Sequence, residues 1–286
     1  MTVFLDYSRE TLDAEYDNRS KVDSAESHLS FWSARSSAVR AQGNHRLDVV
    51  FGPSLDEKLD VFLVDQPDAP IHFFIHGGYW HLLSKAEFSF VAQPFRLNGA
   101  ITVVINYALI PRVDMNELVR QCRKALAWTW KNAHTFGGDQ NQIHVSGHSA
   151  GGHLVGMLCA TDWRRFDSEL PSNPIKSATS LSGLMDLEPI SKCFLGDILH
   201  LSEQDIRRNS PVQLQRNNLC PLTLAVGGKE GREYLRQSAA LVKHWSGLRP
   251  KPQLKVLEDE DHFTIVEQLD DPESEVSRLL LTHMSS

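Results

Sequence analysis

With 286 residues, of which 41% are hydrophobic, the chain can bury a large core, and we expect a single α/β domain over residues 1–286. The formal net charge of -7 offers no basic field for a polyanion, and no apolar run is long enough to span a bilayer. We therefore expect a small-molecule substrate and neither nucleic acid nor a membrane as partner. A homodimer stays open.

The N-terminus and the cysteines both favour a cytoplasmic protein. The chain reaches Asp6 before any apolar stretch develops, unlike a signal peptide. The four cysteines are widely spaced, without a CxxC pair: Cys122, Cys159, Cys193 and Cys220. In a reducing compartment they are interpreted as buried apolar residues.

The first 44 residues are polar and helix-prone with scattered apolar side chains, which predicts an N-terminal helical arm (residues 1–44). Its role is not evident from the pattern. Apolar stretches at 47–51 and 59–64 then flank Gly52-Pro53-Ser54 and predict a β-hairpin. A sheet therefore begins here.

Strand and helix patterns alternate along the rest of the chain. Strands are predicted at residues 71–75, 101–107, 143–145, 177–182, 222–226 and 253–257. Helices are predicted at residues 88–97 and 116–133, and again after residue 150. This order predicts a mostly parallel central sheet with helices on both faces, with ligands beyond the carboxyl ends of its strands.

Residues 184–210 interrupt the alternation with short helical patterns, one of them with Ser202 as its expected cap. An insertion on the carboxyl-end side of the sheet can overhang a ligand site, which suggests a small helical lid. An ordinary helical excursion at the surface explains the pattern equally well. Both interpretations stay open.

A Gly-His-Ser-Ala-Gly motif at residues 147–151 follows a predicted strand and precedes a predicted helix. In a G-x-S-x-G turn of this kind the serine hydroxyl stands clear of the sheet, and the glycines leave no Cβ to collide with neighbouring elements. We predict that Ser149 is a catalytic nucleophile.

A serine hydroxyl needs a base to accept its proton. His262 is the candidate, because it follows the last predicted strand and the chain order serine, acid, histidine is expected here. The rivals are His244, in a helical pattern, and His283, in the final tail. Neither follows a strand, so His262 is preferred.

The base in turn needs an acid that orients it. Glu230 lies on the loop just past the predicted strand at 222–226, and Glu233 is the near rival on the helix that follows. Asp259 and Asp261 stand beside the candidate base in sequence, within an acidic loop that is interpreted as solvated. We predict Glu230 as the acid.

The His-Gly-Gly-Tyr-Trp stretch at residues 76–80 follows a predicted strand. Such a turn can direct backbone N–H groups toward a developing oxyanion. The expected donors are Gly78 and Tyr79, joined by the N–H of Ala150 after the nucleophile.

Trp80 and His153 are candidates for the substrate pocket, although packing is the favoured role of Trp80 and a structural role that of His153. The histidines lack H-E-x-x-H or comparable ligand spacing, so we expect no metal. No cofactor is expected for serine hydrolysis.

Together the motifs at 76–80 and 147–153 resemble the α/β-hydrolase family and, within it, the arylformamidase (kynurenine formamidase) group with its HGGxW motif. The resemblance extends through residues 106–107, 182–187, 227–230, 236–238 and 262–263. It implies that Ser149, Glu230 and His262 form a triad and that the HGGYW turn forms the oxyanion hole. Several members of the group carry Asp where this chain has Glu230.

The resemblance implies hydrolysis of a small amide or ester through an acyl-enzyme, with an aryl formamide such as N-formylkynurenine as the first candidate substrate. A carboxylesterase, or a carbamate or amide hydrolase acting on an aromatic or heterocyclic small molecule, is the alternative. The fold is also used by non-catalytic small-molecule receptors. Retention of all three triad residues argues against a receptor.

Overall fold

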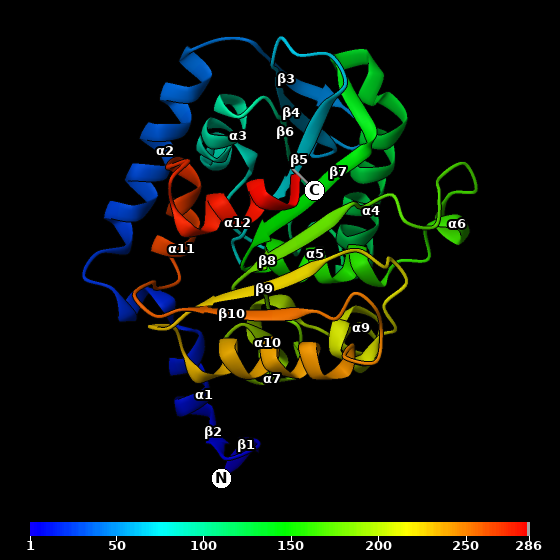
Figure 1. The fold of residues 1–286 in the computed structure, drawn as a ribbon. Helices are drawn as coiled ribbons and strands as arrows, with labels where there is room; N and C mark the ends of the chain where they lie inside the picture. The colour runs from blue at the N-terminus through cyan, green and yellow to red at the C-terminus, as the bar shows by residue number, and fades with distance from the viewer. Residues whose placement is uncertain (285–286) are drawn as a thin grey trace.

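An eight-stranded sheet forms the centre of the computed structural model, which describes residues 1–284 (Figure 1). The strands lie in the order β10-β9-β8-β7-β5-β6-β4-β3. Their bounds are β3 His45–Val50, β4 Lys58–Phe62, β5 Ala69–Ile75, β6 Ile101–Ile105, β7 Gly138–His148, β8 Ser177–Leu181, β9 Leu222–Gly227 and β10 Gln253–Leu257. β4 pairs antiparallel with β3 and β6, and the other neighbours are parallel. The predicted sheet, entered through an antiparallel hairpin, is confirmed.

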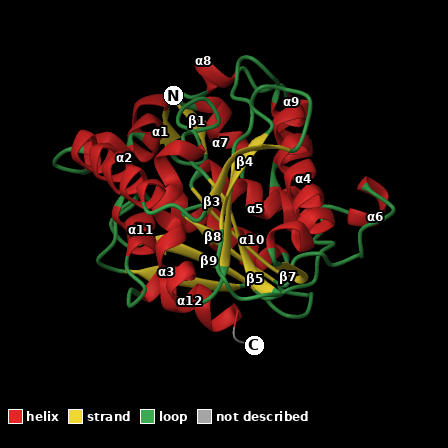
Figure 2. Ribbon diagram, turned by 90° about the horizontal axis from the view of Figure 1, so that it is seen from above, coloured by secondary structure: helices red, strands yellow, loops and turns green. Residues whose placement is uncertain are grey.

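Helices cover both faces of this sheet (Figure 2). One face carries α4 Met115–Asn132, α5 Ala150–Ala160 and α10 Arg232–His244. The other carries η2 Lys85–Ala92, α3 Gln93–Leu97, α11 Thr264–Glu267, η5 Gln268–Asp270 and α12 Glu275–Met284. Figure 2 shows α3 and α11 on one side of the strands and α4 on the other.

Strand β5 illustrates why an uninterrupted apolar run becomes a central strand. Successive side chains of a strand point to opposite faces. Ile71, Phe73 and Ile75 enter the core beneath α4 and α5, whereas Phe74 enters the core beneath η2 and α12. All four are fully buried, so both faces of this strand need apolar residues.

The region predicted as one helix over 88–97 is instead a 3₁₀ helix followed by a short α-helix. Ser84 and Glu87 form a capping box at the start of η2. Pro94 lies in the first turn of α3, where its missing N–H costs nothing, but it could not continue a helix running through it. The proline therefore marks the point at which the helix type changes.

The N-terminal arm consists of a small β1–β2 hairpin (Thr2–Phe4, Tyr7–Ser8), α1 Arg9–Tyr16, η1 Asn18–Lys21 and α2 Ala25–Ala41. Helix α2 packs against η2. Trp32 of α2 donates its Nε1–H to Glu267 at 2.8 Å, and Arg35 forms an ion pair with Asp270 at 2.8 Å. The arm is thus attached to the C-terminal part of the chain, and α2 and α11 lie together at one edge of Figure 1.

Residues 184–210 contain α7 Leu187–Lys192, α8 Gly196–Leu199 and α9 Glu203–Asn209. Ser202 caps α9 as predicted, in a capping box with Asp205. The remaining short elements are α6 Trp163–Phe166, η3 Ala133–Phe136 and η4 Pro211–Gln213. None of the helices within residues 1–284 is long and apolar enough to cross a membrane.

Candidate active site

Ser149 lies on a strained turn between β7 and α5, with φ 57° and ψ −118°. A non-glycine residue at such angles persists only where its surroundings impose them. The backbone N–H of Ser149 donates to the carbonyl of Leu181 at 2.8 Å, which ties the turn to the end of β8. A Cβ on Gly151 would overlap the carbonyl oxygen of Ile75, so the turn can form only with glycine there.

His262 connects Ser149 to Glu230. Its Nε2 lies 3.0 Å from the Oγ of Ser149, and its Nδ1 lies 2.8 Å from Oε2 of Glu230. Both distances are within hydrogen-bond reach, as a nucleophile, base and orienting acid require. The structure therefore brings together the three residues expected from the sequence, although they lie up to 113 positions apart in the chain.

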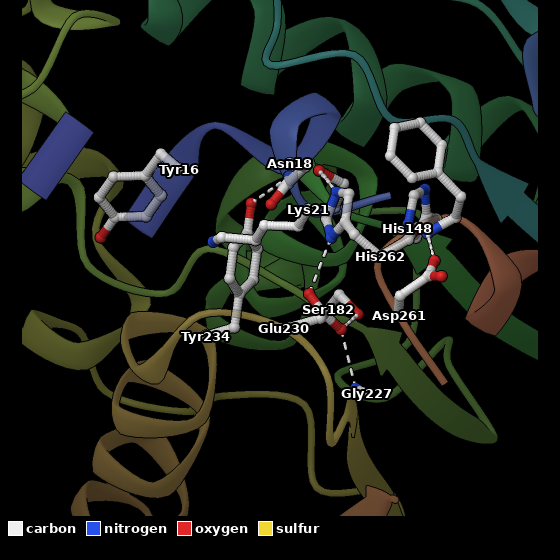
Figure 3. Close-up of polar contacts among 12 residues, drawn as sticks. Tyr16, Asn18, Lys21, His148, Ser182, Gly227, Glu230, Tyr234, Asp261 and His262 are labelled. Atoms are coloured by element: carbon white, nitrogen blue, oxygen red, sulfur yellow. Dashed lines mark hydrogen bonds and ion pairs between the residues drawn. The ribbon is translucent and has the colours of Figure 1, made fainter. Parts of the chain in front are cut away.

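The second carboxylate oxygen of Glu230 is held by residues at the carboxyl ends of β8 and β9 (Figure 3). Oε1 accepts hydrogen bonds from the N–H of Gly227, at 2.8 Å, and from the hydroxyl of Ser182. Hydrogen bonds of this kind fix the orientation of a buried carboxylate. Ser182 was not singled out from the sequence; its signal is its position directly after strand β8.

The rival acids have other partners. Glu233 is fully buried, accepts a hydrogen bond from Tyr16 and pairs with Arg236 at 2.7 Å. Asp261 accepts from the backbone N–H groups of residues 263 and 264, at the start of α11, and lies apart from the His262–Glu230 contact in Figure 3. Asp259 is exposed in the loop.

The rival histidines also lie elsewhere. His244 donates its Nε2–H to the carbonyl of Leu214 at 2.9 Å, and His283 lies near the end of α12. His148, inside the nucleophile motif, donates its Nε2–H to the carbonyl of His262 at 2.8 Å. Burial lowers the pKa of His148 well below its usual value of 6.5, so this ring is neutral and holds the backbone of His262 in place.

The turn at residues 76–80 lies beside Ser149. Gly78 and Tyr79 both line the cavity that contains the serine, and both have positive φ, 111° and 47°. A Cβ on Gly78 would overlap the carbonyl of Leu82, so this position requires glycine. Ala150 is the first residue of α5, directly after Ser149.

The structure does not bring Trp80 and His153 to this cavity. Neither is among the described residues that line it, and both are fully buried. Trp80 donates its Nε1–H to Nδ1 of His153 at 3.1 Å, and His153 donates from Nε2 to the carbonyl of Asn209 at 2.6 Å. The pair packs between the turn and α5, in the structural arrangement favoured from the sequence.

The cavity has a volume of about 230 Å³, and much of its wall comes from segments that the sequence did not connect with the serine. The N-terminal arm contributes Tyr16, Asp17, Asn18, Arg19, Leu29 and Trp32. The 184–210 segment contributes Phe194, Leu195 and Ile198. Whether it moves as a lid stays a prediction.

A buried hydrogen-bond network joins the arm to the turn. The side-chain amide of Asn18 donates to the hydroxyls of Tyr79, at 2.8 Å, and Tyr234, at 2.7 Å. The Tyr79 hydroxyl in turn donates to the carbonyl of Tyr16 at 2.6 Å. Burial raises the pKa of Tyr79 well above 10, so its hydroxyl keeps the proton that this bond needs. No local pattern in the sequence predicts this link.

A mostly parallel sheet that presents a serine on a strained turn, followed along the chain by an acid and then a histidine, is the arrangement of an α/β-hydrolase. In the part of the chain that the structure describes, no group of three or more His, Cys, Asp or Glu side chains could hold a metal ion. The family model BD-FAE matches residues 59–244. The chain belongs to the BD-FAE family of α/β-hydrolases and is a relative of the kynurenine formamidases, as its motifs predict.

Two relatives match over nearly the whole chain. The kynurenine formamidase of Danio rerio is 34% identical over 266 residues, covering 91% of this chain and 88% of the relative. The kynurenine formamidase of Salmo salar is 32% identical over 283 residues, covering 95% and 93%. These relatives confirm the prediction of a hydrolase that acts on a small amide or ester.

Solved structures agree on the fold. A putative thioesterase from Silicibacter sp. TM1040 superposes with a TM-score of 0.84 at 28% identity, covering 94% of this chain and 98% of the other. An esterase from Pyrobaculum calidifontis superposes with a TM-score of 0.72 at 17% identity, covering 99% and 94%. The α/β-hydrolase fold class is thereby confirmed.

Proposed function

We propose that the protein hydrolyses an aryl formamide such as N-formylkynurenine, with Ser149, His262 and Glu230 as its catalytic triad. The observation that carries the triad is the unbroken chain of contacts from the serine Oγ through the imidazole to the carboxylate, at 3.0 and 2.8 Å. The relatives named kynurenine formamidase support the formamide. They cover 91% and 95% of this chain.

In this mechanism Ser149 Oγ attacks the formyl carbon while His262 Nε2 accepts the hydroxyl proton. Glu230 stabilises the imidazolium that forms and keeps the ring in the tautomer that presents a free Nε2. The same proton then passes to the leaving arylamine, whose C–N bond breaks. Water activated by His262 next cleaves the formyl-serine ester and releases formate.

The negative charge that develops on the formyl oxygen needs donors already in place. We assign these to the N–H groups of Gly78, Tyr79 and Ala150. One such donor typically contributes about 3 kcal/mol of transition-state stabilisation. The glycine at 78, required by its surroundings, and the hydroxyl anchor of Tyr79 support this assignment, because both restrict movement of the turn.

The cavity supports a small aromatic substrate. Its volume of about 230 Å³ falls below the roughly 300–1,000 Å³ typical of sites for drug-sized ligands. Trp32 and Phe263 form part of its wall, with ring centroids 5.8 Å apart. A single aryl group with a one-carbon acyl group suits this space better than a long acyl chain.

A carboxylesterase acting on small aromatic esters is the second candidate, favoured by the esterase and thioesterase among the structural neighbours. The test compares kcat/KM for N-formylkynurenine, p-nitrophenyl acetate and an aryl carbamate on the purified protein. The proposal predicts the largest value for N-formylkynurenine. A value for the ester or the carbamate that is a hundredfold higher would contradict it.

We also propose a cytoplasmic location. It is supported by the four cysteines, all of which are free thiols and buried. The homodimer stays a prediction, which sedimentation of the purified protein at several concentrations would test.

A further inference from the structure

Charged side chains are rare in the wall of the candidate active site. Apart from histidines, the only acidic or basic residues among the described lining residues are Asp17 and Arg19. Both are exposed, so they lie where the cavity opens to solvent. Ser149, which also lines the cavity, is only 2% exposed. The cavity therefore has one acidic and one basic side chain at its opening, and mostly apolar and aromatic side chains in the rest of its wall.

Asn18 holds these two residues in place. It lies between them in the chain, is 95% buried, and donates both hydrogens of its amide to the hydroxyls of Tyr79 and Tyr234. Asp17 additionally accepts from the N–H of Ser20 at 3.3 Å, which starts the helix η1. The backbone that carries both charges is thereby fixed to the turn beside the nucleophile.

The side chains of Asp17 and Arg19 can both still bind a ligand. The guanidinium of Arg19 lies 3.5 Å from Glu26, and their side chains are 60% and 77% exposed. An ion pair of this length in solvent contributes little, so a ligand carboxylate can replace it. Asp17 uses Oδ1 for the Ser20 contact, and within residues 1–284 no hydrogen bond to its Oδ2 is seen.

We propose that Asp17 and Arg19 bind the ammonium and carboxylate groups of an α-amino-acid substrate whose aryl amide or ester end reaches Ser149. Arg19 can bind the carboxylate through two parallel N–H···O hydrogen bonds. Holding the zwitterion at the mouth leaves its charges partly hydrated, whereas the apolar walls formed by Trp32 and Phe263 suit the aromatic ring. This inference rests on the proposed function and adds recognition of a charged end to it.

The experiment compares three substrates that share one formanilide group. These are N-formylkynurenine, its analogue without the amino group, and formanilide, which has neither charge. For wild type, Arg19→Gln and Asp17→Asn, the readout is kcat/KM for each charged substrate divided by that for formanilide. Asparagine keeps an acceptor for the N–H of Ser20. Arg164→Gln, an exposed arginine of α6 outside the cavity, is the matched control.

Arg19→Gln is expected to lower the ratio about tenfold or more for both carboxylate-bearing substrates, mainly through KM, because the contact is made equally in the ground and transition states. Asp17→Asn is expected to lower the ratio for N-formylkynurenine but not for the analogue without the amino group. Arg164→Gln is expected to leave both ratios unchanged. This pattern would support both contacts.

Ratios in Arg19→Gln and Asp17→Asn that stay within a factor of two of wild type would overturn the inference and leave the proposed function intact, provided that N-formylkynurenine is a good substrate. A general loss on all three substrates in Arg19→Gln would also overturn it, because that indicates damage to the site. A wild-type protein that cleaves esters and none of the three formanilides would overturn the proposed function and this inference with it.

Discussion

Two of the regions that build the candidate active site differ in how they hold their residues. Ser149, Glu230 and His262 each follow the carboxyl end of a strand. Strand register and close backbone approaches fix their positions. The N-terminal arm reaches the same cavity from the other end of the chain and is linked to the turn by the side-chain hydrogen bonds of Asn18. In the proposed mechanism the first region carries the chemistry, and the arm provides much of the cavity wall.

The comparison predicts unequal consequences of mutation. A change to a proposed triad residue removes a group that the proposed mechanism places against the reacting atoms, so it should lower kcat by orders of magnitude. A change in the arm alters the placement of the turn or the shape of the cavity, so its effects should be smaller and should differ between substrates.

The largest difference expected between paired variants separates Glu230 from Glu233, three positions further along the chain. Glu230→Gln should lower kcat by about 10⁴-fold with the fold intact, because an amide neither stabilises the imidazolium nor enforces its tautomer. Glu233→Gln should instead lower the free energy of unfolding, since Arg236 would lose the more deeply buried of its two carboxylate partners. Steady-state kinetics and urea unfolding of both variants check this. If Glu233→Gln were the folded, inactive variant, the acid would be misassigned.

A smaller effect is expected in the arm. Asn18→Ala removes the donors that hold the Tyr79 and Tyr234 hydroxyls, so the turn gains freedom and kcat should fall by about 10- to 100-fold on neutral and charged substrates alike. Ser20→Ala, on the same short helix but exposed, serves as the control and should keep nearly full kcat. Equal kcat values for the two variants would show that the arm does not position the turn.

The smallest expected effect is on the pH dependence of the free energy of unfolding, through His153, which packs against Trp80 of the turn. Burial lowers the pKa of His153 to about 4, below the value near 6.5 expected when the chain is unfolded. Between these values the unfolded state binds more protons, so the free energy of unfolding should fall as the pH drops from 6.5 toward 4, by up to about 1.4 kcal/mol per pH unit for this group.

His153→Gln should flatten that slope, because glutamine cannot take up the proton in the unfolded state. Urea unfolding at pH 7, 6 and 5 measures the slope in wild type and variant. His76, whose pKa burial also lowers to about 4, remains in both proteins and supplies a common background. Identical slopes would mean that His153 is not held neutral.

The strands and the turns at their carboxyl ends were largely predictable from sequence, because the patterns that indicate them are local. A run such as Ile71–Ile75 favours a strand buried on both faces, and the glycines around Ser149 reflect a turn with no room for a Cβ. The order of serine, acid and histidine then followed from the strands that precede them. These residues were selected from the alternation of elements, the short motifs and the resemblance to the arylformamidase group.

The arm was not predictable in the same way. Asn18 and Arg19 stand in a polar stretch without periodicity, and their relation to Tyr79 and Ser149 exists only once the arm has folded back over the sheet edge. Ser182 was missed for a related reason, since a serine after a strand acquires meaning only when Glu230 lies beside it. Contacts between distant segments leave no local pattern.

The most direct test of the central claim is hydrolysis of N-formylkynurenine by Ser149→Ala. Alanine keeps the small volume that the turn requires and removes only the hydroxyl, so circular dichroism and thermal unfolding should match wild type. We predict that kcat falls by roughly 10⁴-fold or more, as loss of the nucleophile of a triad does. A folded Ser149→Ala protein that retains kcat within a factor of ten of wild type would contradict the account.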